Sequence, residues 1–163
     1  MNDVDTMTEV EVLQATEQIR LLEARYARFA DEKRWADLAG LFTADAVFRP
    51  LDVAGNEISR MSGREDIAAQ LGSRTSGDVQ PIHLLLTHEI EIESATAATG
   101  VWAMSDLIFR GDSAIPEPQP GAVLPPFRTM RGWGHYHVTY RKEDGQWLIA
   151  TRTQTRTRLE FTY

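Results

Sequence analysis

The sequence predicts an α+β fold, in which helices come first along the chain and a mostly antiparallel sheet follows. Two observations support this prediction. In the first half of the chain, apolar residues recur every three or four positions, as on the buried face of a helix. After about residue 79 the period changes to two, as in strands with one buried face. We expect residues 1–163 to form a single domain, because no linker or internal repeat divides them.

Two helices are expected before the first long strand. The apolar stripe of the first helix consists of Val12, Ala15, Ile19, Leu22, Tyr26 and Phe29. The second helix, two to three turns long, is marked by Trp35, Leu38, Ala39 and Phe42. Val47 and Phe48 then open a strand. Residues 1–8 are polar, and we expect them to form a disordered tail.

A third helix is expected after the segment Ser62-Gly63-Arg64-Glu65. This segment has the pattern of a capping box, in which Ser62 accepts a hydrogen bond from the Glu65 amide and Glu65 reaches back. The apolar side of this helix is formed by Ile67, Ala68 and Leu71.

Four long strands are predicted in the second half of the chain, at residues 80–93, 96–110, 129–142 and 146–160. The last two are joined by Glu-Asp-Gly-Gln, a hairpin turn with glycine where a positive φ is needed. Residues 111–128 hold five of the seven prolines, so regular structure is not expected there. A surface insertion is favoured over a lid above a site.

Composition narrows the classes of partner. The formal net charge of −7 argues against nucleic acid or an anionic membrane, since both attract a basic surface. No apolar run approaches the ~18–20 residues of a membrane span. The acidic N-terminus shows no secretory signal, and a cytoplasmic location is the default expectation. The chain contains no cysteine, which excludes disulfides and thiolate metal ligands.

Tyr26 and Asp31 stand five residues apart where the first helical pattern ends. Five residues subtend ~140° on an ideal helix, so both side chains face one cavity only if the helix ends or bends near Asp31. Two interpretations stay open for each residue. Tyr26 is a core tyrosine or a proton donor, and Asp31 is the N-cap of the second helix or part of an acid–base site.

The strand around residues 80–93 contains His83 and His88, which have opposite parity. In a regular strand His88 would face inward with the isoleucines. A bulge near Thr87 would instead put His83 and Leu85 inside and leave the glutamates in water. Alternation alone does not choose between these arrangements.

His135 and His137 share one face of a strand, a spacing that could hold a metal ion. No acidic third ligand stands at a convincing spacing. We therefore favour a partly exposed histidine pair and expect neither a metal nor another cofactor.

Asp106 is the strongest site candidate from the pattern alone, because its strand face is otherwise formed by Trp102, Met104 and Ile108. A carboxylate there must be paired, or desolvation raises its pKa. A structural ion pair is the alternative. The last strand places Arg152, Arg156 and Arg158 on one face. These side chains could pair with acidic residues, bind an anionic substrate group, or form an exposed ladder.

The chain resembles the SnoaL-like branch of the nuclear-transport-factor-2-like superfamily from about Gln18 to Glu160. The resemblance rests on Tyr26, Asp31, Trp35 and Leu41-Phe42, on Thr99-Gly100-Val101-Trp102, on Tyr136-x-x-x-Tyr140, and on Asp144-Gly145-Gln146-Trp147. Within this branch the sequence looks most like the bile acid 7α-dehydratase type, and more distantly like scytalone dehydratases. It differs from the former in His135, His137 and a longer 111–128 insertion.

The resemblance implies helices packed in the concave face of a strongly curved sheet, a cone-like barrel. It also implies dimers or larger homo-oligomers. The catalytic residues that it implies are Tyr26, Asp31, His83, Asp106 and Arg156. By this analogy His83 faces inward, and a bulge follows it in the strand.

These residues suggest a cofactor-independent dehydratase or isomerase. His83, held by Asp31 or Asp106, would remove a proton next to a carbonyl, and Tyr26 would protonate a departing hydroxyl or stabilise an enolate. Arg156 would hold the carboxylate or an anionic part of the substrate. The side chains expected to line an apolar pocket are Leu85, Trp102, Met104, Ile108 and Trp133. They favour a hydrophobic, ring-bearing substrate, such as a steroid or an aromatic catabolite.

The alternative function is a binding or assembly module. The same fold serves as the small subunit of aromatic-ring hydroxylating dioxygenases, where it packs against a catalytic partner. Size-exclusion mass and co-purification discriminate between the two functions, because an obligate hetero-complex with no ligand-sized pocket would favour the module.

Overall fold

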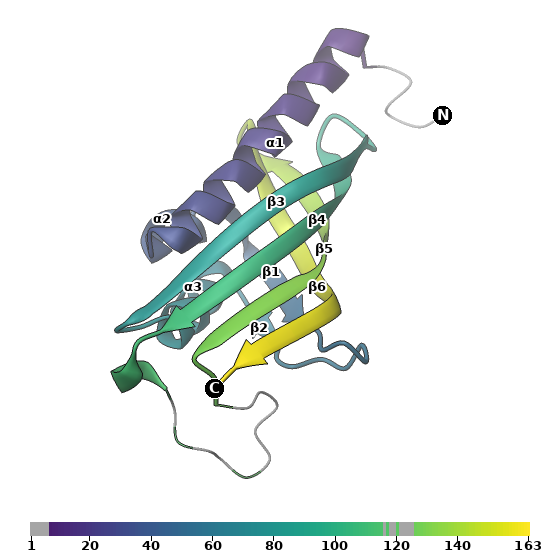
Figure 1. Ribbon diagram of the computed structural model, residues 1–163. Coiled ribbons are helices and arrows are strands. Elements are labelled where there is room, and N and C mark those ends of the chain that lie inside the picture. The colour runs from purple at the N-terminus through teal and green to yellow at the C-terminus, as the bar shows by residue number, and fades with distance from the viewer. Residues whose placement is uncertain (1–6, 116, 118–119, 121–125) are drawn as a thin grey trace.

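The structure is a computed structural model that describes residues 7–115, 117, 120 and 126–163 (Figure 1). The elements in chain order are α1 (Glu9–Asp31), α2 (Trp35–Ala39), β1 (Phe42–Pro50), β2 (Met61–Ser62), α3 (Arg64–Arg74), β3 (Val79–Ile92), β4 (Ala97–Arg110), the 3-10 helix η2 (Asp112–Ala114), β5 (Thr129–Glu143) and β6 (Gln146–Thr162). The predicted α+β class is confirmed. The four long strands begin and end within two residues of their predicted bounds.

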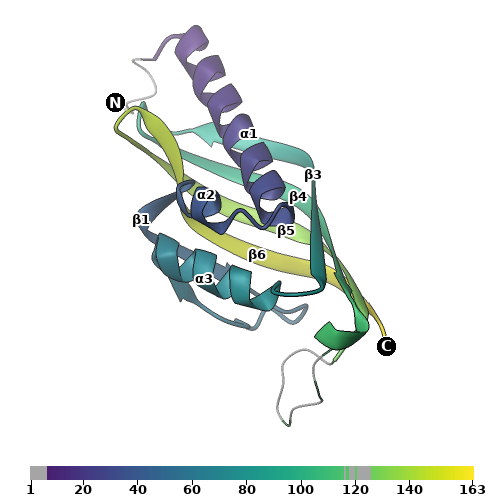
Figure 2. The same cartoon turned by 90° about the vertical axis from the view of Figure 1, so that its left-hand side faces the viewer.

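The strands form one curled sheet with the order β2-β1-β6-β5-β4-β3. Only β1 and β6 are parallel, and every other neighbouring pair is antiparallel. Figures 1 and 2 show α1 lying across the sheet along β3, with α2 and α3 on the same side. The helices thus cover the concave face, which is the expected cone-like arrangement.

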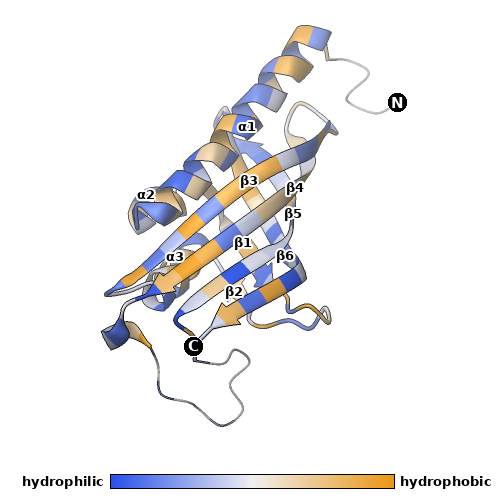
Figure 3. Cartoon of the chain, in the orientation of Figure 1, coloured by the Kyte–Doolittle hydropathy of each residue, from blue (hydrophilic) through white to orange (hydrophobic). Residues whose placement is uncertain are grey.

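The core fills the space between the helices and the concave face. Alternation of hydrophobic and hydrophilic residues is visible along β3 and β4 in Figure 3. From the helices the core receives Ile19, Leu22, Tyr26, Leu38 and Ile67, all almost inaccessible to solvent. From the sheet it receives Phe42, Phe48, Trp102, Met104, Tyr136, Tyr140 and Ile149. Burial of these side chains is the main force that holds the helices on the sheet.

Helix α1 has a well-defined start and end. Thr8 and Glu11 form a capping box, in which each side chain accepts a hydrogen bond from the other residue's amide. The helix ends at Asp31, and Lys33 takes a left-handed conformation with φ 56°. The chain therefore turns at this corner, so that Asp31 points toward the sheet. Residues 1–6, most of the expected disordered tail, lie outside the described residues.

Two predictions about the helices were wrong in detail, and one of the two interpretations of Asp31 is excluded. Helix α2 has five residues rather than two to three turns, and Phe42 already belongs to β1. Asp31 does not cap α2, whose N-cap residue is Arg34. The capping box at Ser62 is absent because the N-cap of α3 is Gly63, with φ 90° and no side chain. Asp66 instead accepts the Ser62 N–H at 2.9 Å.

Two register shifts decide which side chains face inward. In β3 the register with β4 shifts between Leu85 and His88, which confirms the bulge. Val79, Pro81, His83 and Leu85 therefore face inward before the shift, while Glu89 and Glu91 stay exposed after it. In β6 the register with β5 shifts between Arg156 and Arg158. Arg158 is consequently exposed and pairs with Glu160, so the three arginines do not share one face.

The expected 111–128 insertion is described only in part. The prediction that this insertion has no regular structure was wrong, because it contains the short 3-10 helix η2. At its far end Phe127 is buried, and the Arg128 carbonyl accepts the N–H of Arg110 at 2.9 Å. Residues 116, 118–119 and 121–125 lie outside the described part of the chain.

Candidate active site

A cavity of about 160 Å³ lies between the helices and the concave face of the sheet. Its apolar wall includes Ala30, Trp35, Phe48, Ile58, Leu71, Ile108 and Met130. The polar groups that reach it are Tyr26, His83, Asp106, Tyr136, Gln154 and Arg156, with Arg74 and Thr75 contributed by the end of α3. A mostly apolar cavity with a few converging polar groups is the usual form of a small-molecule site.

His83 reaches the cavity from β3 and is held from behind by Asp31. The Asp31 carboxylate accepts the backbone N–H of His83 at 3.0 Å and lies 2.7 Å from its Nδ1. Asp31 itself does not line the cavity. A proton on Nδ1 is the arrangement that this contact favours, and it leaves the Nε2 lone pair free as a proton acceptor. The corner after α1 and the β3 strand thus build a carboxylate–imidazole pair from residues 52 positions apart.

Two phenols lie next to this pair. Tyr26 is in edge-to-face contact with His83 and with Tyr136, at ring-centroid distances of 6.2 and 6.0 Å. Burial raises the pKa of Tyr26, and it raises the pKa of Tyr136 well above the ordinary value. Both hydroxyls therefore keep their protons at neutral pH and can donate to an oxygen that gains negative charge.

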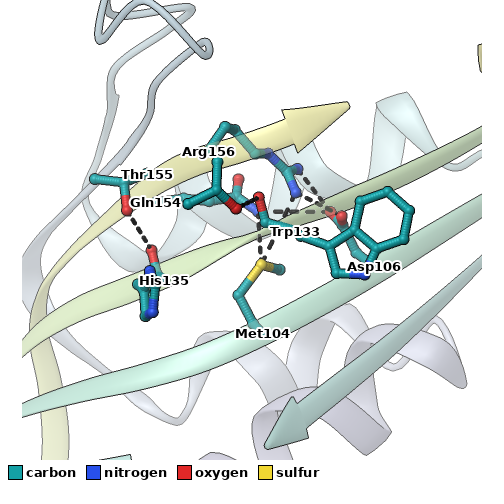
Figure 4. A network of polar contacts seen from close by, with 8 residues as sticks. Met104, Asp106, Trp133, His135, Gln154, Thr155 and Arg156 are labelled. Atoms are coloured by element: carbon teal, nitrogen blue, oxygen red, sulfur yellow. Dashed lines mark hydrogen bonds and ion pairs between the residues drawn. The ribbon is translucent and has the colours of Figure 1, made fainter. Parts of the chain in front are cut away.

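Asp106 and Arg156 form a buried, bidentate ion pair beside the cavity (Figure 4). The two nitrogen–oxygen distances are 2.5 and 2.7 Å, and each side chain is about 8% exposed. Burial opposes the charge on Arg156, but the hydrogen bonds and charge of Asp106 outweigh it and raise the pKa of Arg156. Asp106 is thus neutralised by Arg156, and the carboxylate that holds His83 is Asp31.

A second buried ion pair, between Arg152 and Glu23, packs against the rings of Tyr26 and Tyr136. Arg152 donates to Glu23 at 2.5 Å, and both side chains are completely buried. The Arg152 guanidinium lies 3.7 Å from the ring centre of Tyr26 and 4.5 Å from that of Tyr136. Nε and Nη1 of Arg152 have no hydrogen-bond acceptor among the described residues. The guanidinium instead makes cation–π contacts with the two tyrosine rings. The pair fixes the two tyrosine rings in position.

Four of the five expected pocket residues do not line the cavity, and only Ile108 does. Trp102 instead donates from Nε1 to the Tyr140 hydroxyl at 2.8 Å, in the buried network around Glu23. Met104 is buried behind the Asp106–Arg156 pair, and Leu85 packs against the core near the β3 bulge. Trp133 alternates with buried glycines along β5 and therefore belongs to the other face of the sheet. Alternation placed Trp102 and Met104 on the correct face, and the bulge did so for Leu85, but neither gives the depth along the strand.

His135 and His137 lie on the outer face of β5, with ring centroids 6.3 Å apart. Within the described residues, no three His, Asp or Glu side chains gather in a way that could hold a metal ion. No helix in the described part of the chain is long and apolar enough to cross a membrane.

Several cavity residues were not predicted from the sequence. Tyr136 belongs to the Tyr136-x-x-x-Tyr140 motif on which the resemblance rests, and its inward parity on β5 could also have identified it as a cavity residue. Gln154, on the same face of β6 as Arg156, carried a similar signal. Arg74 and Ile58 gave none, because a helix end and a loop bring them to the cavity.

Comparison with known proteins assigns the fold to a family. The chain belongs to the SnoaL-like domain family, whose sequence model matches residues 11–153. This places it in the nuclear-transport-factor-2-like superfamily, as the resemblance indicated. The resemblance to the bile acid 7α-dehydratase type stays a prediction.

Three solved structures illustrate the similarity. A candidate scytalone dehydratase from Novosphingobium aromaticivorans DSM 12444 has a TM-score of 0.76 and 18% identity over 96% of this chain and 93% of its own. A hexachlorocyclohexane dehydrochlorinase, LinA type 2, has a TM-score of 0.73 and 16% identity over 96% of this chain and 94% of its own. The third is the beta subunit of a candidate aromatic-ring-hydroxylating dioxygenase from the same Novosphingobium strain. It has a TM-score of 0.70 and 15% identity over 91% of this chain and 93% of its own. At these identities the similarity shows the fold.

Proposed function

We propose that this protein is a cofactor-independent acid–base enzyme, a lyase or isomerase that removes a proton from a ring-bearing hydrophobic molecule. The observation that carries the proposal is the Asp31–His83 contact, which presents His83 to a mostly apolar cavity. The similarity in fold to a candidate dehydratase and to a dehydrochlorinase agrees with it. The ligand-sized cavity favours this function over a subunit-like assembly module.

The reaction begins at a C–H bond next to an activating carbonyl. Nε2 of His83 takes the proton, and the electron pair of the C–H bond moves toward the carbonyl oxygen. Asp31 stabilises the imidazolium that forms and keeps the ring oriented. Tyr26 and Tyr136 donate hydrogen bonds to the oxygen that gains charge.

The second step differs between the two reaction types. In an elimination, the electron pair returns to expel a hydroxyl or halide from the adjacent carbon, and a departing hydroxyl takes a proton from Tyr26 or from imidazolium. In an isomerisation, imidazolium returns the proton to another carbon. A positioned acid or base typically contributes ~10²–10⁴ in rate, so two suffice for an activated C–H.

The size of the cavity restricts the substrate. An engineered apolar cavity of ~150 Å³ takes up benzene, and the cavity here is about 160 Å³. Its enclosed part therefore has room for about one ring. We favour an aromatic or other small-ring catabolite over a steroid enclosed along its whole length.

A panel of one- and two-ring ketones that carry a hydroxyl or halide β to the carbonyl tests the proposal. We expect the protein to convert at least one of them with loss of water or hydrogen halide, detected by mass spectrometry. The His83→Ala variant should lose this activity while its circular dichroism spectrum is unchanged. Equal conversion by the wild type and His83→Ala, or none by either, contradicts the proposed function.

A further inference from the structure

A second hollow lies next to the cavity and is lined by residues at the end of α3, the start of β3, the end of β4 and in η2. Figure 2 shows that α3 ends close to the start of β3. The hollow has a volume of about 430 Å³ and is lined by residues 73–74 and 76–79 together with Arg110, Ser113 and Ala114. Arg74 lines both the hollow and the cavity. A molecule that fills the cavity and extends past Arg74 would therefore enter the hollow.

The hollow carries positive charge although the chain as a whole is acidic, with a net charge of −7. Arg74 and Arg110 line it, and the single acidic side chain among its lining residues is Asp78. Lys33 is close by, since its Nζ donates to the Gly77 carbonyl at 3.1 Å. Within the described part of the chain, none of these three cations has a carboxylate at ion-pair distance, whereas eleven other arginines do.

Among the described residues, the contacts of the two arginines include no counter-ion. Arg74 donates to neutral groups, the Ser59 hydroxyl at 2.9 Å and the Gln70 amide oxygen at 3.4 Å. Arg110 lies 3.8 Å from the ring centre of Phe127, and its buried Nη1 has no hydrogen-bond acceptor among the described residues. Burial lowers the pKa of both, in contrast to Arg34, Arg141 and Arg156, whose carboxylate partners raise theirs.

We propose that this hollow is a subsite for an anionic substituent, a carboxylate or another oxyacid group, on the ring compound that the cavity binds. Arg74 and Arg110 would bind the anion, and the ring would lie in the cavity against His83. The proposal rests on the proposed function for the ring, and adds the charge of the substrate to it. Arg156 is not available for this role, because Asp106 already occupies it.

A purely structural role for Arg74 is the alternative. It stands in the last turn of α3, where a cation interacts favourably with the helix dipole. Such a role predicts a loss of thermal stability on substitution and no dependence on the charge of a ligand.

The test compares 2-naphthoate with 2-naphthamide, in which one ring would occupy the cavity and the other would extend past Arg74 toward the hollow. The two compounds have the same rings and nearly the same shape but differ in charge. Binding is measured by isothermal titration calorimetry to the wild type, Arg74→Gln, Arg110→Gln and Arg20→Gln. Arg20 is an exposed arginine of α1, paired with Glu17, so its variant makes the same change in net charge elsewhere. Thermal unfolding of each variant is recorded alongside.

We expect the wild type and Arg20→Gln to bind naphthoate about tenfold or more tightly than naphthamide, as charged hydrogen bonds typically allow. Arg74→Gln and Arg110→Gln should each reduce this preference and leave naphthamide affinity unchanged. The subsite is refuted if the wild type binds naphthoate and naphthamide equally, or if both arginine variants keep the wild-type preference for naphthoate. It is also refuted if the variants lose affinity for both compounds in parallel and unfold at lower temperature. Naphthamide binding without a charge preference refutes the subsite alone, while no binding of either compound also contradicts the ring cavity.

Discussion

Asp106 and Arg156 meet across strand β5 at Gly132, which has no side chain to separate them. A Cβ added at Gly132 would lie 2.2 Å from Nη1 of Arg156 and 2.3 Å from Oδ1 of Asp106. Asp106 on β4 and Leu159 on β6 flank Gly132 in register. Glycine is therefore needed here for space rather than for backbone conformation, and the ion pair depends on it.

Gly132→Ala should accordingly separate the Asp106–Arg156 pair. We expect the free energy of unfolding to fall by roughly 1–3 kcal/mol, the usual cost of overpacking, measured by urea denaturation. Gly40→Ala, at the exposed end of α2 with an ordinary helical φ, is the control and should change it much less. Equal stability of Gly132→Ala and the wild type would show that the pair can shift without loss.

Glu23→Gln should destabilise the fold strongly, because it leaves the Arg152 charge buried without its carboxylate. Removal of one partner of a buried pair typically costs about 3–5 kcal/mol. Glu17→Gln breaks the exposed pair with Arg20 and should cost less than about 1 kcal/mol. Chemical denaturation compares the two, and equal effects would mean that the buried pair has no special weight.

Stability should fall at alkaline pH because of three buried phenols. Burial raises the pKa of Tyr26, Tyr136 and Tyr140 in the folded protein, while an unfolded tyrosine titrates near 10. Above about pH 10 the unfolded chain therefore releases protons that the folded protein keeps, and the free energy of unfolding decreases. Urea denaturation at pH 8 to 11 measures this decrease. Tyr136→Phe should show a smaller one, and a flat profile in the wild type would contradict the burial of these hydroxyls.

Asp31→Asn should change both the tautomer of His83 and the rate. The carboxylate favours the proton on Nδ1, whereas an amide can donate to Nδ1 and move the proton to Nε2. ¹⁵N-detected imidazole NMR distinguishes the two forms. We expect kcat on an identified substrate to fall by roughly 10²–10⁴, with the tautomer changed in the same variant. An unchanged tautomer and rate would leave Asp31 without a role in positioning His83.

The sequence was sufficient for the strands because each has one buried face and a period of two. It was less informative wherever a bulge occurs. The alternation in β3 is compatible with a regular strand and with the bulge after Leu85, and the family resemblance favours the bulge. The register shift beyond Arg156, which turns Arg158 outward, has no signal in the regular Thr-Arg alternation.

The sequence predicted which residues line the cavity better than it predicted which of them form pairs. Tyr26, His83, Asp106 and Arg156 do line one cavity. The choice of Asp31 over Asp106 as the partner of His83 required the geometry of the α1 corner, since the sequence gives no distance across 52 residues. The expected pocket residues Trp102 and Met104 face inward as predicted, but they lie in the packed core because alternation fixes a face and not a depth.

The proton-transfer role of His83 is most directly measured by hydrogen–deuterium exchange at the α-carbon of a bound ring ketone in D₂O, followed by proton NMR. The wild type and His137→Ala, which changes an exposed histidine on the outer face, should exchange the proton at the same rate. His83→Ala should exchange it about 10²–10⁴ times more slowly while retaining affinity for the ketone. Exchange at the wild-type rate in His83→Ala would contradict the central claim that this imidazole is the base of the site.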